Sequence, residues 1–212
     1  MRLGSPVPWQ NRVTPLGELL ADPARGLVYG NRGCLHDASG RIVRRYQVRR
    51  WIACRLEFNG RRRHPLMRPG RFTELFFLDE ATALAAGHRP CAECRREDYV
   101  RFAAHWAERH RAETKADAID LRLHAERIDR EGARRLHELP AASLPDGAFV
   151  LRGAEPHVVV GPSLRLWTPR GYTLKAPRPT RGMATVVTPP SLVEHLRVAR
   201  ESAVPLLHPS AA

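Results

Sequence analysis

The hydrophobic positions in the middle of this chain recur with a helical period. An apolar stripe at i, i+3, i+4 and i+7 begins at Tyr99 and ends at Trp106, which predicts an amphipathic helix over about residues 96–110. Asp79 is a favourable N-cap for a shorter helix that begins just after it. From residue 80 onward, helices are predicted at 80–86, 96–110, 116–128, 131–139 and from the Thr188-Pro189 start signal to about residue 200.

Shorter runs rich in β-branched and aromatic residues flank these helices. They predict strands at 27–29, 41–44, 51–58, 73–78, 148–152, 157–160, 164–168 and 183–188. Asn59-Gly60 is a hairpin signal after the third of these runs. Residues 1–26 contain four prolines and little periodicity, which predicts loops with one short helix near 16–20.

The order of these elements predicts an α+β fold. The composition changes near residues 140–147, where helical spacing gives way to short strands and turns. We therefore expect a β-hairpin and helix module at 1–112, a helical connector at 113–140, and a small β-rich subdomain closed by a helix at 141–212.

Two of the four cysteines, Cys91 and Cys94, stand two residues apart between two predicted helices. Two thiols at this spacing on a turn can hold one tetrahedral metal ion from one side. Arg89, Arg95 and Arg96 lie beside them in the sequence and favour the thiolate form that binds metal. This spacing predicts a metal site.

The balance of charges predicts an anionic partner. The chain has 35 Lys and Arg residues against 22 Asp and Glu residues, a net charge of +13, and nucleic acid is the commonest partner of such a protein. Residues 40–72 hold eleven arginines and one acid, Glu57, with aromatic residues interleaved. Such a surface can bind phosphates and stack on bases. The predicted nucleic-acid-binding residues are Arg49, Arg50, Arg61, Arg62 and Arg63. An alternative basic surface consists of Arg127, Arg130, Arg134 and Arg135.

The sequence also predicts a location. No apolar run is long enough to cross a bilayer, and the first residues lack the apolar core of a secretion signal. Four cysteines without an export signal favour a reducing compartment and metal binding over disulfides. We expect a cytoplasmic protein with no membrane partner.

Residues 76–94, FFLDEATALAAGHRPCAEC, resemble the zinc-binding N-terminal module of the bacterial Ada family of DNA-repair proteins. In that family a strand, a helix reading EALAAGFRPC and a C-x-x-C knuckle follow in the same order. The resemblance implies an α+β DNA-binding scaffold that holds one zinc ion through four cysteines, one of which accepts a methyl group from a DNA phosphotriester. The family's second thiol pair matches Cys91 and Cys94, and Cys54 lies in the region of the first pair.

We therefore predict a closed zinc site that joins the hairpin to the helical part. Its predicted ligands are Cys34, Cys54, Cys91 and Cys94. Cys54 is the candidate nucleophile, because the neighbouring Arg55 and a bound zinc ion would both favour its thiolate. The alternatives to Cys34 as fourth ligand are His36, His88 and His124.

Three functions remain open from the sequence. The first is a zinc protein that binds nucleic acid, most often DNA, and the second is a DNA alkyl acceptor that uses a zinc thiolate. The third is a zinc hydrolase. Pro90–Cys94 and His124-Ala125-Glu126 resemble the two motifs of zinc deaminases, in the opposite order along the chain. A ββα-metal nuclease with His36 or His64 as its catalytic histidine is the other hydrolase considered.

Overall fold

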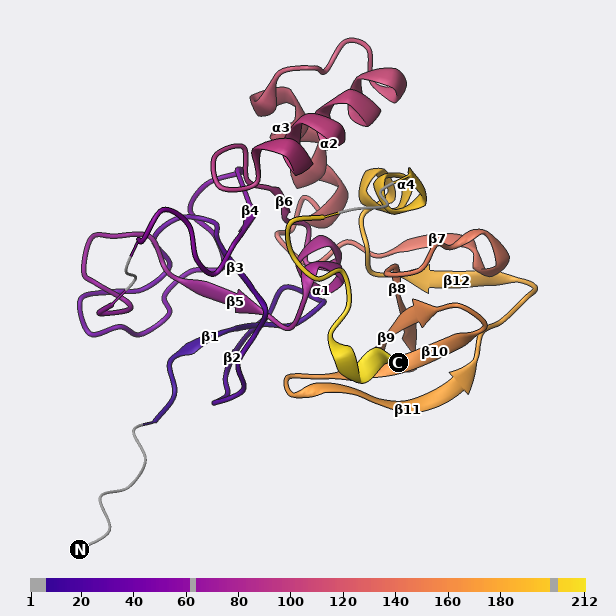
Figure 1. The fold of residues 1–212 in the computed structure, drawn as a ribbon, viewed down its shortest axis with the longest axis horizontal. Coiled ribbons are helices and arrows are strands. Elements are labelled where there is room, and N and C mark those ends of the chain that lie inside the picture. Colours follow the sequence, from indigo (N-terminus) through magenta and orange to yellow (C-terminus); the bar gives the residue numbers. More distant parts are fainter. Residues whose placement is uncertain (1–6, 62–63, 199–201) are drawn as a thin grey trace, which may run out of the picture.

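The computed structural model describes residues 7–61, 64–198 and 202–212. Within these residues the chain folds into two six-stranded sheets and four α-helices, which confirms the predicted α+β class (Figure 1). None of the helices in these ranges combines the length and hydrophobicity required to cross a membrane.

The first sheet contains the strands from the N-terminal part of the chain, in the order β2-β1-β5-β3-β4-β6. Two neighbouring pairs are parallel, β1 with β5 and β4 with β6, and the others are antiparallel. The bounds are β1 Gln10–Val13, β2 Leu19–Ala21, β3 Val28–Asn31, β4 Ile52–Cys54, β5 Leu75–Phe77 and β6 Arg89–Pro90.

The second sheet is antiparallel throughout, in the order β11-β10-β9-β8-β12-β7. It confirms the strands predicted after residue 147 and adds β7 and β11. The bounds are β7 His137–Pro140, β8 Phe149–Arg152, β9 Glu155–Val160, β10 Ser163–Thr168, β11 Gly171–Pro177 and β12 Met183–Val186.

Four of the six predicted helices are confirmed. They are α1 Glu80–Ala85, α2 Arg96–Arg109, α3 Ala116–Arg127 and α4 Pro190–Val198. Short 3₁₀ turns occur at Ala141–Ser143 and Pro209–Ala211. Asp79 caps α1 as expected, since its carboxylate accepts a hydrogen bond from the backbone N–H of Thr82.

Helix α1 lies between the two sheets and is buried on every side (Figure 1). Ala83 and Ala86 pack into the core of the first sheet, and Ala81 and Ala85 pack into that of the second. Small side chains on both faces allow two sheets to approach one helix closely. A further core joins Phe102 and other residues of α2, α3 and α4 to the second sheet, and so crosses both boundaries predicted at 112 and 140.

Some predicted elements are wrong. Residues 10–21 form the hairpin β1–β2 instead of a helix near 16–20. The helix predicted at 131–139 is a turn followed by β7, and Gly132 in this turn has a φ of 81°. Asn59 and Gly60 form a turn, but β4 ends at Cys54, so the turn does not join paired strands. Residues 41–44 contribute one isolated bridge, from Ile42 to His36.

Candidate metal centre

Strand register brings Cys54 next to Cys91. β4 and β6 are parallel, with Ala53 opposite Pro90. The backbone N–H of Cys91 donates to the carbonyl of Ala53 at 3.0 Å, which continues this pairing by one residue. Cys54 and Cys91 therefore lie at the same end of adjacent strands, which are about 4.8 Å apart in a sheet.

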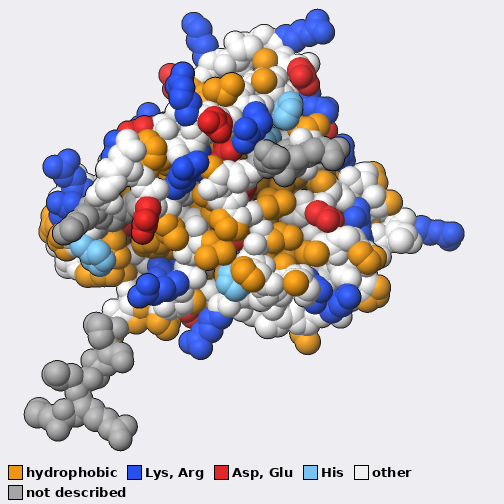
Figure 2. Space-filling view, viewed as in Figure 1, with side chains coloured by type: hydrophobic (Ala, Val, Ile, Leu, Met, Phe, Trp, Pro, Cys, Tyr) orange, Lys and Arg blue, Asp and Glu red, His pale blue; other side chains and the backbone are white. Residues whose placement is uncertain are grey.

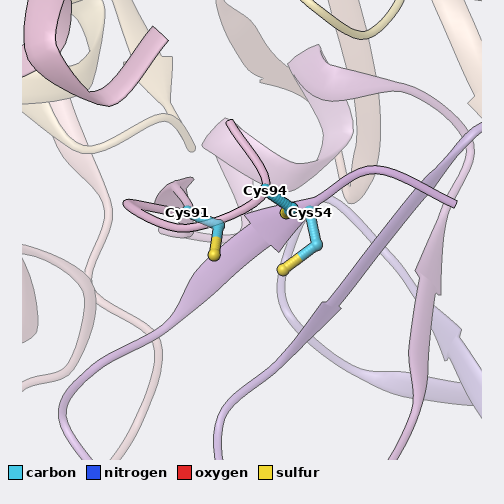
Figure 3. A group of neighbouring side chains, drawn as sticks. All are labelled: Cys54, Cys91 and Cys94. Carbon is cyan, nitrogen blue, oxygen red and sulfur yellow. The ribbon is translucent and has the colours of Figure 1, made fainter. Parts of the chain in front are cut away.

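A tight turn then returns the chain so that Cys94 joins the pair. The backbone N–H of Arg95 donates to the carbonyl of Cys91 at 3.1 Å, and α2 begins at the next residue. The three sulfur atoms lie within 4.8 Å of one another, and all three residues are buried (Figure 3). Zinc–sulfur bonds of about 2.3 Å place tetrahedral ligands about 3.8 Å apart, so this group can hold one metal ion.

The three thiols strongly perturb one another. Hydrogen bonds from Cys54 and Cys94 stabilise the thiolate of Cys91 and lower its pKa. The same contact with Cys91 raises the pKa of Cys54 far above its usual value. The group by itself therefore favours one thiolate, and a divalent cation would allow all three sulfurs to ionise.

Two of the three arginines beside these cysteines in the sequence, Arg89 and Arg95, pair with acids. Arg89 is buried and binds both carboxylate oxygens of Asp120, at 2.8 and 2.7 Å. Arg95 is buried in ion pairs with Glu80 and with Asp98. Their charges are thus compensated within α1, α2 and α3, and they fix the helices around the knuckle.

A cavity of about 330 Å³ adjoins the three thiols. Its wall carries two cations, Arg61 and Arg68, and the buried carboxylate of Glu74. Glu74 accepts a hydrogen bond from the backbone N–H of Met67 at 2.8 Å. Arg61 forms an exposed ion pair with Glu93 and lies over the ring of Phe58, with 5.5 Å from the guanidinium carbon to the ring centroid. The group of three thiols thus opens toward a partly charged cavity.

Cys34 lies outside the group of three thiols. In the antiparallel pair β3–β4, Tyr29 is opposite Cys54, and Cys34 lies five residues beyond Tyr29, about 16 Å along an extended chain. Its thiol donates instead to the carbonyl of His36 at 3.5 Å. The register of the hairpin therefore separates Cys34 from the ligand that was expected to be its partner.

The histidines considered as fourth ligands also lie elsewhere. The ring nitrogens of His36 contact the hydroxyl of Thr73 at 2.6 Å and the carbonyl of Arg68 at 3.1 Å. His88 is fully buried and packs against aromatic rings. His124 lies on α3, with its ring 4.9 Å from that of Tyr46.

The segment resembling a deaminase motif serves helix packing. Glu126 accepts hydrogen bonds from the backbone N–H of Ser191 at 3.0 Å and from its hydroxyl at 2.6 Å. Ser191 lies in the first turn of α4, so Glu126 fixes α3 against α4. His124 and Glu126 are not in the thiol group.

The predicted nucleic-acid-binding residues divide into two places. Arg49 and Arg50 are exposed and precede β4, whereas Arg61 is exposed beyond its other end. Arg62 and Arg63 lie outside the described residues. In the alternative surface, Arg127 is buried and donates to the carbonyls of Gly87 and Arg49, so it is not available at the surface.

Two residues of the cavity wall were missed from the sequence, Glu74 and Arg68. Glu74 is an acid directly before the buried strand β5. A buried acid needs an ionic or hydrogen-bonding partner, so its position in the sequence could have marked it as a candidate site residue. Arg68 was one of eleven arginines in its segment, and nothing in the sequence distinguished it from the others.

Comparison with known protein families, with curated proteins and with solved structures finds no match to this chain. The fold and the group of three thiols therefore carry the functional argument, and the resemblance to the Ada module stays a prediction.

Proposed function

We propose that this protein binds one zinc ion through Cys54, Cys91 and Cys94 and binds nucleic acid, DNA in the first instance, through the basic surface beside that site. The observation that carries the proposal is the meeting of three buried thiols within 4.8 Å. Thiolate ligands favour zinc among the common divalent ions of cells. All four cysteines are free thiols, which supports a reducing, cytoplasmic setting.

The distribution of charge supports the nucleic-acid part of the proposal. Lys and Arg side chains are spread over the face shown in Figure 2, and fewer acidic side chains accompany them. Arg61 and Arg68 line the cavity next to the thiols, and Phe58 offers an aromatic ring there. Cations hold phosphates and an aromatic ring can stack on a base, so this region suits a nucleic-acid strand.

Metal analysis and DNA binding test the proposal together. Protein purified without chelator should contain one zinc ion per chain by elemental analysis. Fluorescence anisotropy with labelled duplex DNA should give a dissociation constant of about 1–100 μM at physiological salt, weakening as salt increases. Single-stranded DNA and RNA of the same sequence identify the preferred form. Absence of zinc, or affinity that does not respond to salt, would contradict the proposal.

The number of thiols in the group favours a second candidate, a zinc hydrolase. Catalytic zinc sites have three protein ligands and leave a fourth position for water, whereas structural sites are closed by four. Here three cysteines meet beside a cavity that also contains Glu74, a carboxylate able to accept a proton. X-ray absorption of the zinc form would show three sulfurs and one exchangeable water oxygen for this candidate, whereas a fourth protein ligand would close the site and contradict it.

Alkyl transfer is the remaining alternative, with Cys54 as the acceptor. Incubation with methylphosphotriester DNA followed by intact-mass measurement would show a single added methyl group. Cys54→Ser would abolish that addition. No addition to the wild-type chain would exclude alkyl transfer and leave the binding function.

A further inference from the structure

A second cavity shares no lining residue with the cavity at the metal centre. Its volume is about 790 Å³, which falls within the roughly 300–1,000 Å³ typical of small-molecule sites. Its walls come from the β1–β2 hairpin, the segment after residue 41, the segment before β7 and the β8–β9 turn, so both sheets contribute. Many of the lining side chains are apolar, including Leu16, Leu19, Ile42, Ile128 and Leu151.

Two arginines that are held rigidly form part of this apolar wall. Arg32 is 1% exposed, donates to the carbonyl of Gly17 at 2.8 Å, and lies over Trp51 with 4.5 Å from its guanidinium carbon to the ring centroid. Arg134 reaches inward and donates to the carbonyls of Ala85 and Val187. The Nε groups of Arg32 and Arg134 are buried, and neither has a hydrogen-bond partner among the described residues.

The positive charge in this wall has little compensation. None of the ion pairs in the described ranges involves Arg32, Arg45 or Arg134. Glu18, which is exposed, is the one acid among the described residues that line the cavity. Burial, followed by the charges of Arg134 and Arg45, lowers the pKa of Arg32 to about 9. Burial also lowers the pKa of Arg134 to about 10.

Hydrogen bonds to backbone carbonyls account for only part of the reason that Arg32 and Arg134 are buried here. Ala85 ends α1, so Arg134 satisfies carbonyls that the end of this short helix leaves free. Carbonyls carry no net charge, however, and a buried cation without a counter-ion is costly to desolvate. An anion in the cavity would offset that cost through its opposite charge.

We propose that this cavity binds a small amphipathic organic anion, a carboxylate or a phosphate monoester that carries an apolar group. The anionic group would lie against Arg32, Arg134 and the exposed Arg45, and the apolar group against the leucine side chains of the β1–β2 hairpin. This site depends neither on the bound metal nor on nucleic-acid binding.

Isothermal titration calorimetry of the full zinc-loaded chain tests this proposal. The probes are octanoate and phenyl phosphate, their neutral counterparts octanol and phenol, and inorganic phosphate alone. At least one organic anion should bind with a dissociation constant below about 1 mM. Its neutral counterpart and inorganic phosphate should bind at least about tenfold more weakly. Failure of both anions, or equal binding of a neutral counterpart, would overturn the proposal.

Variants separate a specific site from general attraction to a basic protein. Arg45→Ala should weaken anion binding about tenfold, because a charge-assisted hydrogen bond is lost. Arg45 is exposed and donates one bond, to the carbonyl of Gly132, so this variant should fold. Arg135→Ala is the matched control, since Arg135 is exposed, adjacent to Arg134 and not in the cavity wall. Equal weakening by both variants would show non-specific attraction and overturn the proposal.

Discussion

At the scale of single residues, Cys54, Cys91 and Cys94 repel one another as soon as more than one of them is ionised. Their sulfurs lie within 4.8 Å in a buried setting, where water screens charge poorly. A divalent cation removes this repulsion, so loading the site with metal should release protons and stabilise the fold. Metal binding at this group would therefore be coupled to the packing of β4, β6 and the start of α2.

Replacing single cysteines should show which of them bind the metal ion and which does not. Cys54→Ser should lower zinc affinity by more than the roughly 10–100-fold that loss of an outer-shell partner costs. Cys34→Ser is the matched control and should keep one zinc ion per chain, because Cys34 lies outside the group. Elemental analysis and competition with a chromophoric chelator measure both. Equal zinc loss in the two variants would restore the four-cysteine site expected from the sequence.

All three thiols of the group were among the predicted ligands, but local spacing accounts for only two of them. Cys91 and Cys94 are two residues apart on one turn, and local geometry brings them together. Cys54 joins them because β4 and β6 are parallel with Ala53 opposite Pro90. Cys34 lies outside the group for the same kind of reason, since β3 carries it away from Cys54. Strand register is a property of the whole sheet, so a single sequence does not define it.

At the scale of elements, α3 is fixed to β6 by the buried pair of Arg89 and Asp120. Both oxygens of Asp120 accept hydrogen bonds from Arg89, at 2.8 and 2.7 Å. Asp120→Ala should lower the free energy of unfolding by about 3–5 kcal/mol, because it leaves a buried cation without a partner. Urea denaturation followed by circular dichroism measures this change.

The pair of Arg122 and Glu113 provides a control of the same chemistry at the surface. Arg122 also contacts both carboxylate oxygens of Glu113, but both side chains are partly exposed. Glu113→Ala should change the free energy of unfolding by less than about 1 kcal/mol. A similar loss in both variants would mean that burial does not determine the strength of the Arg89–Asp120 pair.

The N-terminus of α1 is joined to the C-terminal segment through Asp79. One carboxylate oxygen accepts from Thr82, and the other accepts from the hydroxyl of Tyr172 and from the backbone N–H of His208, at 2.7 and 2.8 Å. Asp79→Ala should cost about 2–4 kcal/mol, since it removes the helix cap and leaves a buried hydroxyl unpaired. Tyr172→Phe removes one bond and should cost about 1 kcal/mol. Thermal and urea unfolding compare the two, and equal costs would contradict the role of the cap.

Elements were predictable where the sequence specifies them locally. The cap at Asp79 and the apolar stripe ending at Trp106 correctly predicted α1 and α2. Strands β1 and β2 were missed because each is only three or four residues long and β1, Gln10–Val13, is mostly polar, so neither shows a clear strand periodicity. The helix predicted at 131–139 failed because Gly132 forms a turn and Arg134 points inward.

At the scale of the whole molecule, the count of 35 Lys and Arg residues overstates the cations available at the surface. Arginine is also a structural residue here. The side chains of Arg32, Arg89, Arg95 and Arg127 are buried and bind carbonyls, carboxylates or aromatic rings. Composition alone does not separate these from exposed arginines, so the charge predicted an anionic partner but not its position.

If the surface beside the metal centre binds nucleic acid, replacing Arg61, Arg62 and Arg63 with alanine should weaken binding more than an equal loss of charge elsewhere. The slope of log K against log salt should become shallower by about 0.9 for each lost phosphate contact on duplex DNA.

The matched control replaces three exposed arginines in or near the second sheet, Arg152, Arg170 and Arg181. Both variants have the same net charge, so a difference between them reports position. Anisotropy titrations at several salt concentrations measure the slopes. Identical slopes would show that binding follows net charge alone, and the surface near Arg61 would then have no special role.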